Sequence, residues 1–177
     1  MAPRTVPNSP HAPSGPNAPK PPVAPATLIA ELARAPEIIV PLAFELPAAH
    51  RKTRPAPGKW SVHEHACHLA VVHGLFFTRL DKMLAAPGAQ IVPYNPDKDE
   101  PADALLQRDL TAEMDRFTAD RAKLVGRLKS LSPTQWTIEA DHPEYARYSI
   151  GIMFRHLALH DLFHAYRIEE LVLKRDW

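Results

Sequence analysis

The chain has 177 residues, with 21 Lys and Arg against 20 Asp and Glu, ten His, one Cys and twenty Pro. A net charge of +1 argues against a nucleic-acid binder, and a single cysteine excludes a disulfide-stapled secreted scaffold. No apolar stretch approaches the roughly 18 residues of a membrane span, and the N-terminus lacks the basic start and apolar stretch of a secretory signal. We therefore expect a cytoplasmic protein without a membrane partner.

The N-terminal segment is rich in proline. Nine of the twenty prolines fall in the first 25 residues, a composition that favours extended, solvated backbone. We predict a disordered tail over residues 1–25, followed by one domain over residues 26–177. The stretch APKPPVAP contains a PxxP pattern, so the alternative role of the tail is to bind a partner domain.

A helical pattern begins near Thr27, where apolar residues recur at three- and four-residue spacing to Leu46. Pro36 and Pro41 interrupt this pattern. Because proline is costly inside a helix and tolerated in its first turn, we predict that Pro36 starts a new helix.

The second helix has a clear N-terminal signal. Ser61 and Glu64 have the spacing of a capping box, in which each side chain bonds to the backbone N–H of the other residue. The apolar positions that follow keep helical spacing up to Pro87 and Gly88, which are expected to end the helix.

Two further helices follow a long connection over residues 86–101. The third is predicted to begin near Ala102, and its charged run RDLTAEMDRFTADRAK is interpreted as a solvated face. Ser149 is the expected N-cap of the last helix. Four amphipathic segments with no strand signal predict an all-α fold, an antiparallel four-helix bundle.

Histidines are concentrated on two of these helices. The second helix carries His63, His65, His68 and His73, and the last carries His156, His160 and His164. Helix positions four residues apart lie on one face, so the last helix presents a column of three imidazoles. Spacing alone does not choose between the pairs 156/160 and 160/164, which share His160.

Two imidazoles one turn apart can bind one divalent ion, and a third ligand must then come from a facing helix. On the second helix, His68 lies near the apolar side, whereas we expect His63, in the first turn, to be solvated. Three neutral imidazoles would leave coordination positions open, as in catalytic sites. The alternative for any single histidine is a hydrogen-bonded core or surface residue.

Two other residues have alternative interpretations. The stretch HDLFH (160–164) resembles the HExxH motif of metalloproteases, but Asp161 stands in place of the glutamate and no further ligand pattern follows, so Asp161 either orients an imidazole or faces solvent. Cys67 is either a nucleophile or, inside an apolar helix, an inert small hydrophobe.

The two histidine segments resemble motifs of the DinB-like metal-binding four-helix bundle superfamily. PGKWSVHEHACHLA (57–70) is similar to its Trp, Ser/Thr, His-Leu segment, and HPEYARYSIGIMFRHLALHDLFHAYRI (142–168) is similar to its C-terminal motif. The resemblance covers residues 26–177 and implies His68, His160 and His164 as metal ligands. The chain departs from the frequent His-His pair of the last motif by having Phe163 before His164.

The resemblance also implies a function. It indicates a metal-dependent enzyme that acts on a small molecule. Zinc or nickel suits a site of three imidazoles. We place thiol transfer, with a low-molecular-weight thiol, slightly ahead of hydrolysis as the reaction. The alternative is a non-catalytic metal-binding or stress-associated helical bundle that acts through association as a homodimer or with a partner. No separate catalytic residue is assigned.

Overall fold

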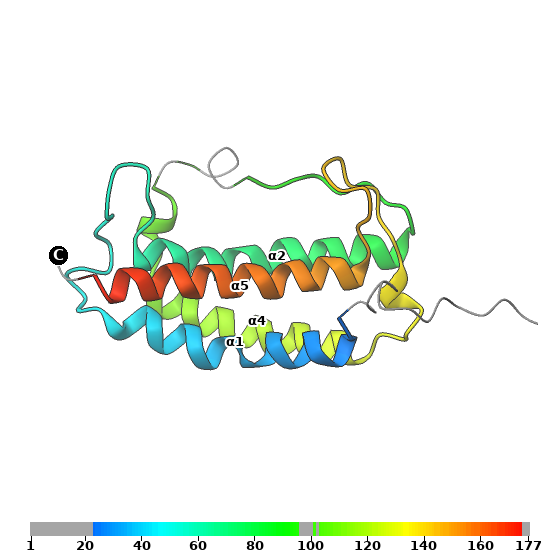
Figure 1. Cartoon of the computed structure of the whole chain (residues 1–177), viewed down its shortest axis with the longest axis horizontal. Coiled ribbons are helices and arrows are strands. Elements are labelled where there is room, and N and C mark those ends of the chain that lie inside the picture. Colours follow the sequence, from blue (N-terminus) through cyan, green and yellow to red (C-terminus); the bar gives the residue numbers. More distant parts are fainter. Residues whose placement is uncertain (1–22, 96–100, 102, 175–177) are drawn as a thin grey trace, which may run out of the picture.

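The computed structural model describes residues 23–95, 101 and 103–174 (Figure 1). Its elements are the helices α1 (Pro25–Glu45), α2 (Val62–Ala85), α4 (Leu110–Lys129) and α5 (Ile150–Val172), with short 3-10 turns η1 (Leu105–Gln107) and η2 (Gln135–Thr137). Isolated bridges, such as that between Gln90 and Asp141, are the extent of β pairing in these ranges. Residues 1–22 of the predicted tail lie outside the described residues.

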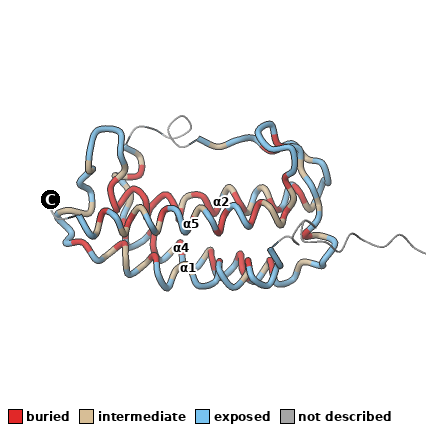
Figure 2. The backbone as a smooth tube through the Cα atoms, viewed as in Figure 1, coloured by how far each residue is buried: buried red, intermediate tan, exposed pale blue. Residues whose placement is uncertain are grey.

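The four long helices form a bundle, which confirms the predicted fold class. α2 packs against α4 and α5, and α1 packs against the same two helices. Buried positions alternate with exposed ones along α1, α4 and α5 (Figure 2), as expected for amphipathic helices around a shared core, whereas residues 62–70 of α2 are all buried. Among the described helices, none combines the length and the apolar character needed to cross a bilayer.

Because of the direction of the helices, the connection between α2 and α4 must be long. α2 runs opposite to α5 and in the same direction as α4 (Figure 1). The connection therefore returns along the bundle, and its first part, residues 86–95, passes beside α2. Arg79 holds it by donating to the carbonyl of Val92 at 2.7 Å, and Lys82 donates to the carbonyl of Gln90 at 2.7 Å.

The predicted capping signals are confirmed. The Ser61 N–H donates to the Glu64 carboxylate at 2.9 Å, and the Glu64 N–H donates to the Ser61 hydroxyl at 3.3 Å. Ser149 likewise accepts from the N–H of Ile152 at 3.2 Å. The predicted start of the third helix near Ala102 was wrong, because α4 begins at Leu110, where the Asp109 carboxylate accepts from the Ala112 N–H at 2.8 Å.

The prediction that Pro36 starts a new helix was also wrong, since α1 is continuous and contains both Pro36 and Pro41. Proline has no N–H, so Pro36 leaves the carbonyl of Leu32, four residues earlier, without its helical donor. In the bundle, the Arg121 guanidinium donates to that carbonyl at 3.0 Å. A tertiary hydrogen bond therefore compensates part of the cost of the internal proline.

Arg121, on α4, contacts the other three helices of the bundle, which corrects the interpretation of its charged run as a solvated face. Its side chain is 1% exposed and donates to Asp161 of α5 at 2.6 Å, to His73 of α2 at 3.0 Å and to the Leu32 carbonyl of α1. Burial, with Arg121 beside it, lowers the pKa of His73 to about 3, so the neutral ring can accept this bond at neutral pH. The rest of the predicted face is largely exposed, with Glu113 a second buried exception.

Replacing Arg121 by Met tests this network. The substitution leaves Asp161 as an uncompensated buried carboxylate, and we expect it to lower the free energy of unfolding by about 3–5 kcal/mol. Arg127→Met is the matched control on the same helix, because its ion pair with Asp81 lies at the surface and is worth at most about 1 kcal/mol. Urea unfolding followed by circular dichroism measures both, and equal small losses would contradict the assigned role.

Candidate metal centre

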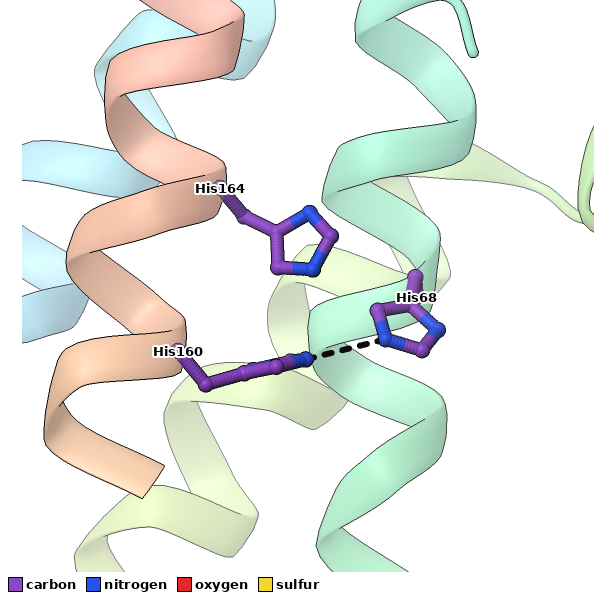
Figure 3. Close-up of side chains that lie close together, drawn as sticks. All are labelled: His68, His160 and His164. Atoms are coloured by element: carbon purple, nitrogen blue, oxygen red, sulfur yellow. Dashed lines mark hydrogen bonds between the residues drawn. The ribbon is translucent and has the colours of Figure 1, made fainter. Parts of the chain in front are cut away.

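Three histidines from α2 and α5 meet inside the bundle (Figure 3). His68 projects from α2, and His160 and His164, one turn apart, project toward it from α5. Each ring offers one nitrogen, and these three atoms all lie within 4.8 Å of one another. The Nε2 atoms of His68 and His160 are 3.0 Å apart. The structure thus brings together the three residues implied by the family resemblance.

The arrangement is chemically suited to a divalent metal. Tetrahedral zinc places imidazole nitrogens about 3.4 Å apart, which is close to the 3.0 Å between the Nε2 atoms of His68 and His160. Burial lowers the pKa of His68 to about 3 and of His160 to about 4, and it lowers the pKa of His164 as well. The three rings are therefore neutral at pH 7 and keep lone pairs for a metal ion. The buried Nδ1 atoms of His68 and His160 have no partner among the described residues.

His65 contacts one member of the histidine triad formed by His68, His160 and His164, namely His164. Its Nδ1 lies 2.8 Å from Nδ1 of His164, and both side chains are buried. One of these two nitrogens must donate and the other accept. With its Nδ1 engaged by His65, His164 retains Nε2 as the nitrogen for another ligand. In the sequence analysis, His65 was one of four histidines on the second helix, and no role was assigned to it.

Trp60 forms a second support that the sequence interpretation did not identify as part of the site. Its ring lies 4.9 Å from that of His68 and stacks on that of His164 at 5.9 Å, centroid to centroid. Trp60 directly precedes the N-cap Ser61 and contacts His65 at 5.4 Å, which is the pairing of a hydrophobic staple. The capping signal at Ser61 could therefore have placed Trp60 against the first histidine turn.

The triad borders a cavity of about 670 Å³, which is large enough for a small-molecule ligand. Trp60 and Tyr94 contribute to its wall, and the Tyr94 ring stacks on His68 at 6.5 Å. Tyr94 belongs to the connection between α2 and α4, so the returning chain forms part of the cavity. Phe163, which replaces the family's first histidine of the pair, is 57% exposed and also lines the cavity.

The remaining histidines fall outside the triad. His156 is exposed and lines the cavity, and its ring contacts Tyr145. His63 was expected to be solvated, but it is 2% exposed and its Nε2 bonds to the carbonyl of Leu105 at 3.1 Å. The 3-10 turn η1 packs over the start of α2 and covers this ring.

Asp161 and Cys67 are both buried. Asp161 forms the ion pair with Arg121 and does not line the cavity, which removes the resemblance to a metalloprotease glutamate. Cys67 is fully buried among apolar residues, and burial raises the pKa of its thiol to about 12. This environment favours the inert alternative for Cys67.

The sequence profile of the DinB superfamily matches residues 31–168. A protein of Oceanobacillus iheyensis, provisionally named a metal-dependent hydrolase, is 28% identical over 151 residues, covering 84% of this chain and 86% of its own length.

Two solved structures from Bacillus subtilis are similar in fold. YfiT, described as a probable metal-dependent hydrolase with an unusual four-helix bundle topology, has a TM-score of 0.75 and 18% identity, with 93% of this chain and 91% of YfiT covered. The DinB-like protein YjoA has a TM-score of 0.58 and 16% identity, with 82% of this chain and 90% of YjoA covered.

Proposed function

The chain belongs to the DinB superfamily, and we propose that it is a metal-dependent enzyme that hydrolyses a small molecule, with His68, His160 and His164 as the metal ligands. One observation carries the proposal: three neutral imidazoles from two helices present nitrogens within 4.8 Å of one another at the wall of a cavity. A closed structural zinc site has four protein ligands, whereas three leave room for a substrate.

The donor set limits the choice of metal to those that accept imidazole nitrogen, among which zinc and nickel fit best. When bound, such an ion supplies a Lewis acid and lowers the pKa of bound water. The protein's part is to hold three rings neutral and oriented. Burial keeps them neutral, and contacts with Trp60 and His65 restrict how they turn.

The relatives favour hydrolysis over the thiol transfer that the sequence interpretation placed first. The protein of Oceanobacillus iheyensis and YfiT are both named as hydrolases of this metal-dependent kind. The cavity beside the triad favours an enzyme over a purely structural metal-binding bundle, because a structural site has no need of a ligand-sized space.

Replacing His160 by Ala tests the ligand set. We expect the metal content of purified protein to fall from about one equivalent to below about 0.1, because two ligands do not retain a divalent ion. His156→Ala is the matched control on the same helix face and should keep the wild-type content. Mass spectrometry of the metal, with circular dichroism to verify helix content, measures both. Tight retention in His160→Ala would rule out this ligand set.

A substrate screen tests the reaction. We expect metal-loaded protein to cleave members of an ester or amide library, and we expect a chelator or the His160→Ala substitution to abolish cleavage. The same samples are screened with low-molecular-weight thiols and electrophiles. Thiol-dependent turnover without any hydrolysis would refute the hydrolase assignment and leave the metal site standing.

A further inference from the structure

The charged residues that line the cavity are all cations. Lys59, Arg79 and Arg167 contribute to the wall, and no aspartate or glutamate of the described chain does. Of the three, Arg167 forms an ion pair with Glu170, while the ammonium group of Lys59 has no ion pair or hydrogen bond with any described residue. Cations around a low-dielectric cavity raise the local concentration of anions.

Arg79 is the best placed of these cations. Its Nη2 donates to the carbonyl of Val92 at 2.7 Å, and its guanidinium lies over the Phe76 ring at 6.0 Å from the centroid. Its Nε is buried and has no partner among the described residues. A buried N–H without an acceptor is unfavourable, so a rotation of the Arg79 side chain that brings this N–H to an anionic oxygen of a ligand would be favourable.

Apart from these cations and five histidines, the wall is mostly apolar or aromatic, with Trp60, Phe76 and Phe163 among its members. We propose that the substrate has an apolar body and one anionic group, a carboxylate or a phosphate, which Arg79 binds with support from Lys59. This inference rests on the proposed function for the reaction that follows binding. The charge preference itself depends on the cations and the cavity.

Calorimetry with matched probes tests the proposal. We expect purified protein to bind 4-phenylbutyrate at least about tenfold more tightly than the neutral 4-phenylbutanol, a difference of about 1.4 kcal/mol. 3-Phenylpropyl phosphate, measured in parallel, distinguishes a phosphate site from a carboxylate site. Arg79→Gln should remove most of the preference and Lys59→Gln part of it. Arg155→Gln, at an exposed position outside the cavity, is the charge-matched control.

The outcomes separate this inference from the metal proposal. A preference for the anion that persists in His160→Ala supports the inference even if the metal assignment fails. Metal-loaded protein that binds the acid and the alcohol equally, or binds neither anion, overturns it. An effect of Arg155→Gln as large as that of Arg79→Gln also overturns it, because the preference would then reflect net charge alone.

A second inference comes from the contact between His65 and His164. We infer that His65 is a positioning residue, whose Nδ1 fixes the ring of His164 and directs its Nε2 toward the metal. Groups that bond to metal-ligating imidazoles commonly contribute 10- to 100-fold in metal affinity. The inference rests on the proposed ligand set, and it assigns His65 no contact with substrate.

Metal affinity, measured by competition with a chromophoric chelator, tests the role of His65. We expect His65→Phe to weaken binding about 10- to 100-fold and His65→Gln, which retains a hydrogen-bonding side chain, to recover part of the loss. His63→Phe is the matched control, because His63 is also buried on the same helix but bonds to the carbonyl of Leu105 instead. Wild-type affinity in His65→Phe refutes the positioning role, whereas absence of metal from the wild type refutes the ligand set.

Discussion

The buried guanidinium of Arg121 is the interaction on which the geometry of the bundle depends. It joins α4 to Asp161 of α5, to His73 of α2 and to the Leu32 carbonyl of α1. A buried charge is stable where its partners are held at fixed positions, so this network restricts sliding between the helices. Asp161 directly follows His160 on α5, and His73 lies on the helix that carries His68. The network therefore fixes the register in which the two halves of the candidate metal centre face each other.

The sequence predicted those parts of the structure that depend on neighbours along the chain. The capping box at Ser61 and the N-cap at Ser149 were found because their partners lie three residues away. The periodicity of the apolar residues predicted the bundle, and the histidine spacing placed His160 in a column. The choice of His164 as its partner came from the family motif, because a repeat of four residues looks the same in either direction.

The parts that the sequence did not predict depend on partners far away in the chain. Arg121 lies in a run that alternates charged and apolar residues like any solvated helix, and His73 and Asp161, which make its burial favourable, are distant in sequence. His63 is covered by η1, whose position follows from the return of the chain between α2 and α4. That return also brings Tyr94 to the cavity, and helical periodicity contains no information about it.

The proline inside α1 links two positions of the bundle that are distant in sequence. A residue with an N–H at position 36 would restore the local helical partner of the Leu32 carbonyl, and Arg121 would then share an acceptor that it now holds alone. Substitutions at positions 36 and 121 are thus expected to be non-additive in the free energy of unfolding, although the two residues lie on different helices. The effect of a change in α1 then depends on the residue present in the core of α4.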